Sequence, residues 1–197
     1  METDSDILFV QAINGHMHDG NTDEAIRLMR QNPDVVNRTN SRVRSWLNLT
    51  VGHGHLAVVD YLLEAGYDIN SGHGVEKWTV LDEALLAGEA LDRPRLVKAL
   101  LDRGADPNVS RPLIGSINPR QGDDAASLEL VRLLVEVGRA DVAREYDRFG
   151  NKDDTFTALE FAEMNGRPAV AAYLRSKGAT DRPARPAPPP AAKRKGR

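Results

Sequence analysis

The chain has 197 residues, of which 41% are hydrophobic, and this length fits one folding unit better than two. It contains no cysteine, which excludes disulfides, thiolate metal sites and cysteine nucleophiles. No apolar run approaches the roughly 20 residues of a membrane helix, and the start, Met1-Glu2-Thr3-Asp4, is acidic where a secretory signal is basic. We therefore expect a cytoplasmic protein without a membrane segment.

The first predicted unit spans about residues 1–40 and contains two helices. Apolar residues recur at helical spacing within residues 7–12 and again within residues 23–29. The unit then ends at residues 32–37, Asn-Pro-Asp-Val-Val-Asn, which we interpret as a turn because proline, asparagine and aspartate favour turns.

Two later segments, residues 59–70 and 97–108, share the pattern Val-x-x-Leu-Leu-x-x-Gly-x-Asp-x-Asn. The valine and leucines form one stripe of an α-helix, and the glycine can adopt the left-handed conformation that ends it. The Asp-x-Asn that follows is a turn signal. These segments place a second unit at about 41–74 and a third at about 75–108, each too small to bury its apolar face without a neighbour.

A shorter helix precedes each of these segments and is predicted from its cap. Residues 79–84 and 157–162 both have the form Thr-x-Leu-acid-x-Ala, which is typical of a capping box. Residues 45–48, Ser-Trp-Leu-Asn, are a weaker relative. The weakest is residues 111–114, where Pro112 follows Arg111 and suits the first helical turn.

Two more units, about 109–152 and 153–181, complete the array. Residues 131–138 repeat the pattern and end at Gly138, whereas residues 170–181 contain one added residue before Gly178. We place other extra residues in the loops at 89–93 and 119–124. The fourth turn, about 140–156, is longer than the repeat needs, and long ordered loops are often functional.

The last 16 residues, 182–197, form a Pro/Ala-rich basic tail. They contain six basic residues and no acidic ones, so the net charge of −3 divides into −9 for residues 1–181 and +6 for the tail. With no apolar side chain larger than alanine or proline, the tail is expected to be disordered.

The repeated units resemble the ankyrin-repeat family. The family pattern is Thr-Pro-Leu-His-x-Ala, then Gly-His-Leu, an apolar second helix and Gly-Ala-Asp-x-Asn; residues 54–56 and 104–108 reproduce the second and last parts. The resemblance covers residues 1–181 and implies an all-α fold, an α-solenoid of stacked helix-loop-helix repeats with projecting turns. The family's histidine is replaced here by Asn48, Asp82, Ile114 and Glu160, so we expect looser stacking and a broad or multistep urea transition.

The resemblance also implies where a partner binds, since the turns and first helices of such arrays line a concave face. Aromatic and arginine residues are the usual anchors of interfaces. Trp78 has an equally strong alternative role in packing between units. The predicted partner-binding residues are His73, Glu76, Lys77 and Trp78 in the second turn, Val109 and Arg111 in the third, and Tyr146, Asp147, Arg148, Phe149, Asp153 and Asp154 in the fourth.

Four histidines form two His-x-His pairs, His16 with His18 and His53 with His55, both predicted in loops between helices. A metal site shared by the pairs is conceivable, but a two-residue spacing on a loop fixes no coordination geometry. We predict no metal and no cofactor. The sequence also contains no nucleophile elbow and no phosphate loop, so we predict that the protein is not an enzyme.

The expected function is therefore non-catalytic binding of a protein partner by a monomer. The acidic body favours a basic partner, as in a bacterial immunity protein that neutralises a toxin. One alternative is a scaffold or host-directed effector. Another is a nucleic-acid-associated regulator using the basic tail, which we rank lower because no aromatic residues interleave with its charges.

Overall fold

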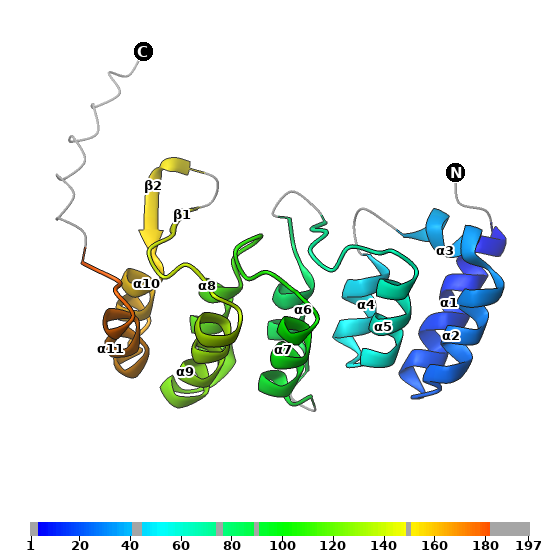
Figure 1. The fold of residues 1–197 in the computed structure, drawn as a ribbon, viewed down its shortest axis with the longest axis horizontal. Helices are drawn as coiled ribbons and strands as arrows, with labels where there is room; N and C mark the ends of the chain where they lie inside the picture. Colours follow the sequence, from blue (N-terminus) through cyan, green and yellow to red (C-terminus); the bar gives the residue numbers. More distant parts are fainter. Residues whose placement is uncertain (1–3, 41–44, 74–76, 89–90, 149–150, 182–197) are drawn as a thin grey trace, which may run out of the picture.

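The computed structural model describes residues 4–40, 45–73, 77–88, 91–148 and 151–181, with the backbone alone described for Arg38, Arg148, Lys152 and Asp153. These residues form eleven α-helices and one two-stranded hairpin. Most of the helices lie in antiparallel pairs, and Figure 1 shows the pairs side by side in a single row. The pairs are α1 (Asp4–His18) with α2 (Thr22–Gln31), α4 (Trp46–Gly52) with α5 (Leu56–Glu64), α6 (Val80–Leu86) with α7 (Arg93–Asp102), α8 (Pro112–Ile117) with α9 (Asp124–Arg132), and α10 (Ala158–Met164) with α11 (Pro168–Ser176).

The first helix of a pair begins where the sequence predicts a cap. The amide of Thr79 donates to the Asp82 carboxylate at 2.8 Å, and the amide of Thr157 donates to Glu160 at 2.8 Å. Both capping boxes are confirmed. Pro112 stands at the first position of α8, as expected, because its missing N–H has no helical partner to lose there.

The core is a continuous row of apolar side chains between neighbouring helices. Each regular second helix buries two adjacent residues and a third one turn later, which are Val58, Val59 and Leu62 in α5 and Leu96, Val97 and Leu100 in α7. Fully burying such a side chain contributes roughly 1.5–3 kcal/mol. No single pair encloses its own core, so the pairs depend on one another for stability.

The turns after α5 and α7 are joined by hydrogen bonds from one asparagine each. The Asn70 amide group accepts from the backbone N–H of Asp106 at 2.7 Å and donates to the carbonyl of Gly104 at 3.1 Å. Asn108 makes the same two bonds to the turn of the next pair, with Asp141 at 2.8 Å and Arg139 at 3.2 Å. The repeated Asp-x-Asn therefore sets the spacing between pairs as well as the turn. We call these bonds the asparagine ladder.

The second helices α5 and α7 are also joined by an ion pair. Arg103 donates to both carboxylate oxygens of Asp60, at 2.6 and 2.8 Å. The hydrogen bond from Arg103 lowers the pKa of Asp60 below its usual value. Both side chains are partly exposed, so the pair is expected to contribute about 1 kcal/mol or less.

The extra residue of the fourth unit lies within its second helix. Leu62 and Leu100 each precede a left-handed glycine by four residues, whereas Leu134 precedes the left-handed Arg139 (φ 62°) by five. A π-helical turn, η2 (Leu133–Val137), accommodates the added residue. The prediction that Gly138 ends this helix like the other glycines is therefore wrong by one position, since its φ is −80°.

The fifth unit, in contrast, has no added residue. Leu174 precedes Gly178 by four residues, as in the regular units. The buried neighbours in α11 are Val170 and Ala171, which take the positions of Leu96 and Val97 in α7. The prediction of an added residue is wrong because Val170 corresponds to Leu96 of α7, and not to Val97.

The prediction of an entirely helical chain is wrong in the segment after α9. Strands β1 (Glu145–Arg148) and β2 (Asn151–Thr157) form an antiparallel hairpin, in which Tyr146 is paired with Phe156. Their rings lie 6.1 Å apart, and Phe156 lies 5.4 Å from Phe161 of α10. Cross-strand aromatic pairs stabilise such hairpins, and here they also attach the hairpin to the row.

The first unit differs from the prediction at its end. Residues 32–37 were predicted as a turn, but Pro33 begins a third helix, α3 (Pro33–Thr39). Proline fits this position because it is favourable at the start of a helix. The indole N–H of Trp46 in α4 donates to the carbonyl of Val36 at 3.0 Å and anchors α3 to the next pair.

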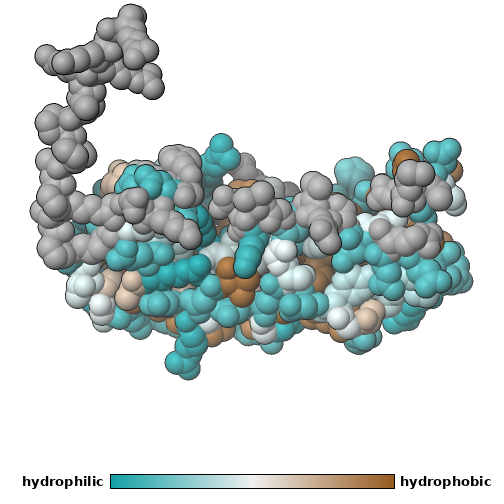
Figure 2. Space-filling view, turned by 90° about the horizontal axis from the view of Figure 1, so that it is seen from above, coloured by the Kyte–Doolittle hydropathy of each residue, from teal (hydrophilic) through white to brown (hydrophobic). Residues whose placement is uncertain are grey.

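Among the described residues, none of the helices has the length and apolar character needed to cross a bilayer. Figure 2, viewed from the side of the projecting loops and hairpin, shows a largely hydrophilic face with small apolar areas between polar side chains.

Candidate functional site

A groove between the first helices α6 and α8 brings together two predicted binding residues, Trp78 and Arg111. Its volume is about 300 Å³. Trp78 precedes α6, and Arg111 is the N-cap of α8, so both lie at the end of the groove nearest the projecting loops. We call this the α6–α8 groove, and its main lining residues are Trp78, Asp82, Leu86, Arg111, Ile114 and Arg120.

The groove is shallow and largely apolar because of what forms its floor and walls. Leu85 is buried beneath it, and Gly115 lets α8 approach closely, since an added Cβ would lie 3.1 Å from a Leu85 methyl. Leu86 is 54% exposed although it is a large apolar residue. Trp78 and Ile114 are half-buried. An apolar side chain of a bound molecule can therefore contact Leu86, Trp78 and Ile114 together.

The hairpin is tied to the upper end of this groove by an ion pair. Nη1 of Arg111 donates to the backbone carbonyl of Asp147 at 3.0 Å, and Nη2 donates to its carboxylate. Both side chains are about one-third exposed. The structure thus brings these two predicted binding residues into contact, but their first role is to hold the hairpin beside the groove.

Asp82 is a buried carboxylate at the junction of the third and fourth units. It is 6% exposed and accepts hydrogen bonds from the amide and hydroxyl of Thr79, both at 2.8 Å. It also bonds the Ser110 hydroxyl and the backbone N–H of Arg111, which belong to the next pair. Burial raises the pKa of Asp82 above its usual value, and these bonds partly oppose the shift.

Tyr146 lies inside the hairpin, which corrects the expectation that its ring is exposed to a partner. It is 4% exposed, its ring is tilted by 35° against that of Phe156, and the Arg144 guanidinium lies 5.1 Å from the centre of its ring. Burial raises its pKa to about 12. Its hydroxyl therefore remains protonated at neutral pH, and its contribution is to pack the hairpin.

The loop before α6 is held by backbone contacts. His73 and Trp78 exchange two backbone hydrogen bonds, at 3.0 and 2.9 Å, and His73 is half-buried. Lys77 is exposed and adopts a left-handed conformation, with φ 51°. Gly72 is needed for close packing, because an added Cβ would lie 2.5 Å from the oxygen of the Lys77 carbonyl.

The other predicted binding residues do not join the groove. Glu76 and Phe149 lie outside the described residues, and Arg148 and Asp153 are described by their backbone only, in β1 and β2. Asp154 in β2 and Val109 before α8 are half-buried.

Sequence reasoning missed three groove residues: Leu86, Ile114 and Arg120. Leu86 and Ile114 lie in short helices that were predicted from their caps alone, and Arg120 lies in a 3₁₀ turn, η1 (Pro119–Gln121), inside a loop that was assigned no function. No local signal distinguishes Leu86 from Leu85, since adjacent apolar residues such as Leu100 and Leu101 are both buried in another helix of the row.

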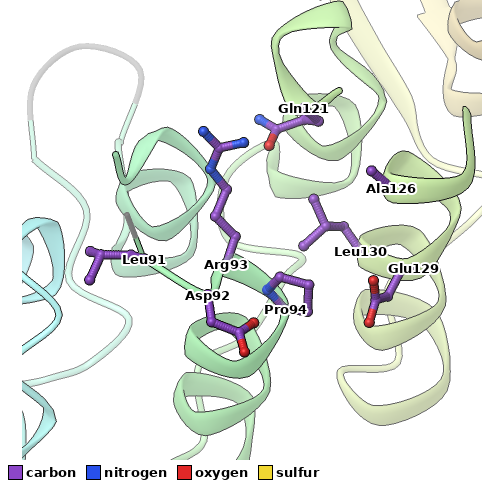
Figure 3. Close-up of a pocket in the computed structure, with 8 residues that line it drawn as sticks. All are labelled: Leu91, Asp92, Arg93, Pro94, Gln121, Ala126, Glu129 and Leu130. Carbon is purple, nitrogen blue, oxygen red and sulfur yellow. The ribbon is translucent and has the colours of Figure 1, made fainter. Parts of the chain in front are cut away.

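A second depression of about 320 Å³ lies between α7 and α9, on the other side of Gln121. Figure 3 shows Asp92, Arg93 and Pro94 at the start of α7 facing Ala126, Glu129 and Leu130 of α9. Arg93 donates to the carbonyl of Ala87 at 2.9 Å, and Gln121 donates to that of Leu85 at 2.9 Å. Both side chains thus cap the end of α6, which gives this depression a structural explanation.

The histidine pairs are arranged differently from the prediction. His16 and His18 lie in the last turn of α1, not in a loop. The Nε2 of His55 donates to the carbonyl of Met17, and the Thr22 hydroxyl lies 3.3 Å from Nδ1. Both ring nitrogens of His55 therefore link the first and second pairs. Within the described ranges, no three His, Asp or Glu side chains are close enough together to hold a metal ion.

Comparison of the sequence with models of known protein families and with curated proteins found no match.

Proposed function

We propose that the chain is an array of five ankyrin-type repeats, an α-solenoid, and that it works as a non-catalytic protein-binding module. The observation that supports this best is the asparagine ladder, in which Asn70 and Asn108 each make the same two bonds to the turn of the following pair. Such a bond can recur only if successive pairs are related by nearly the same displacement. The row of helix pairs in Figure 1 agrees with this relation.

The surface that best suits binding combines the α6–α8 groove with the hairpin. The groove offers apolar contact area, and the hairpin projects beside it, held by Arg111 and Asp147. Side chains on such a face can vary without disturbing the core of the row. Asp82, the most deeply buried acid near the groove, already has its hydrogen-bond partners in Thr79, Ser110 and Arg111, which favours a structural role over acid–base chemistry.

For the partner we propose a basic protein met in the cytoplasm, because residues 1–181 carry a net charge of −9. A bacterial immunity protein bound to its toxin is one setting that fits a small acidic module. A scaffold or host-directed effector is another, and it differs in having several partners at moderate affinity.

Affinity capture with the full-length chain tests the proposal. A chain with Asp153→Lys and Asp154→Lys alters the hairpin, and a control with Glu64→Lys and Asp102→Lys makes the same charge change on exposed positions of the second helices. We expect one stoichiometric protein partner, retained by the control and lost from the hairpin variant. Recovery of no protein by the unaltered chain contradicts the proposal.

A third chain, in which the six basic tail residues are replaced by glutamine, separates the alternative of a nucleic-acid regulator. If binding is to DNA or RNA, it weakens steeply with salt and is lost in this variant. The proposed protein complex instead persists.

A further inference from the structure

We infer that the α6–α8 groove receives a short extended segment of the partner, which inserts one large apolar side chain and places a carboxylate against Arg120. This inference rests on the proposed function and adds the chemistry of the bound segment. It concerns the local contact only, so it is compatible with a partner whose overall charge is basic.

The dimensions of the groove limit what it can hold. Arg111 and Asn118 cap the two ends of the six-residue helix α8. At about 1.5 Å per residue, this helix is on the order of 10 Å long, the span of about three residues of extended chain. A volume of about 300 Å³ is at the lower limit of ligand pockets, which suits one or two side chains better than a cofactor.

The walls determine that the inserted side chain is apolar. Leu86 is 54% exposed, whereas Leu81 and Leu85 of the same helix are buried. Together with the half-buried Trp78 and Ile114 it forms a surface that an apolar side chain would shield from water. Trp78 adds an aromatic face, the kind of group that dominates binding energy at interfaces.

The charges around the groove indicate that the partner group beside the inserted side chain is negatively charged. Of its two arginines, Arg111 is paired with Asp147, and Asp82 is buried among hydrogen-bond donors. Arg120 is exposed, and within the part of the chain that the structure describes its guanidinium has no carboxylate partner. A partner carboxylate at this end would therefore gain an ion pair without displacing an existing one.

The probe for a test is a library of random 12-residue peptides displayed on phage and selected on the immobilised full-length chain. We expect enriched peptides to share a large apolar residue with an aspartate or glutamate within three positions of it. One enriched peptide is then synthesised, and its affinity is measured against Leu86→Gln and Arg120→Glu. The matched controls are Val137→Gln, an apolar residue 42% exposed, and Arg95→Glu, an exposed arginine of α7.

The expected result is a loss of affinity of about tenfold in each groove variant and less than about twofold in each control. A peptide with its acidic residue changed to lysine should regain affinity for Arg120→Glu. The inference is overturned if no peptide is enriched, if enriched peptides are basic, or if the controls weaken binding equally. If a protein partner binds but its affinity is unchanged by Leu86→Gln and Arg120→Glu, this inference alone is contradicted. If no partner is recovered, the proposed function is contradicted.

Discussion

The turns after α5 and α7 and the hairpin after α9 join successive helix pairs in different ways. Each short turn contains one asparagine that bonds to backbone atoms of the next turn, so these bonds fix the spacing between turns. The hairpin depends on side chains, through the Arg111–Asp147 ion pair and the rings of Tyr146 and Phe156. The difference indicates that the ladder builds the scaffold, while the hairpin and the neighbouring groove are free to become specific.

The largest expected effect comes from removing the aromatic core of the hairpin. Phe156→Ala takes away the contacts with Tyr146 and Phe161 and should lower the free energy of unfolding by about 3 kcal/mol. In hydrogen exchange, amides of β1 and β2 should lose protection while those of α7 keep it. Met164→Ala, at a side chain 62% exposed, is the control and should change stability little. Equal loss of protection in α7 would show that the hairpin is part of the scaffold.

Breaking one step of the asparagine ladder should have the next largest effect. Asn108→Ala removes two bonds between the third and fourth units and should lower the free energy of unfolding by about 2 kcal/mol. Asn165→Ala removes a bond within one unit, to Phe161, and should lower it by about 0.5–1 kcal/mol. Urea unfolding measures both. Equal effects would remove the distinction between bonds that join units and bonds within them.

In the irregular turn after α9, a substitution is expected to raise the free energy of unfolding. Arg139→Gly relieves a left-handed backbone conformation at an exposed residue and should raise the free energy of unfolding by about 0.5 kcal/mol, net of the greater freedom of glycine in the unfolded chain. Arg95→Gly in the helix α7 should lower it by about 1 kcal/mol. The midpoints of urea unfolding of the two variants, measured in parallel, test this prediction. A loss of stability in Arg139→Gly as well as in Arg95→Gly would mean that the Arg139 side chain is itself stabilising.

The smallest expected effect is a change in pH dependence at Asp82. Its folded pKa is raised, so between the usual value of 3.8 and that raised pKa the folded state binds more protons than the unfolded state. The contribution of this group to stability therefore decreases as the pH rises through that interval. The difference in free energy of unfolding between the unaltered chain and Asp82→Asn should follow this slope from acidic to neutral pH. A difference that is independent of pH contradicts the shift.

The scaffold was predictable from the sequence where it repeats, and the exceptions have physical causes. Capping pairs such as Thr79 with Asp82 act over three residues, so their sequence is sufficient to predict them. Gly138 matched the pattern by chance, because a π turn shifted the left-handed position to Arg139. The hairpin was not predicted because charged residues separate Tyr146 from Phe156 along the chain.

The groove was the least predictable part of the molecule. Trp78 and Arg111 were expected at the binding surface as an aromatic and an arginine in projecting turns. Leu86 and Arg120, however, come from different units and become neighbours only when α6 and α8 lie side by side over Gly115. No local pattern contains that distance information.

Site-specific photo-crosslinking tests the central claim most directly. A benzophenone amino acid is placed at position 86 in the groove, or at position 137 beyond the end of α9, in the full-length chain inside its own cells. We predict a crosslink to one protein from position 86 and none from position 137. A crosslink from position 137 alone, or from neither position, would contradict the claim that the α6–α8 groove is where this protein binds its partner.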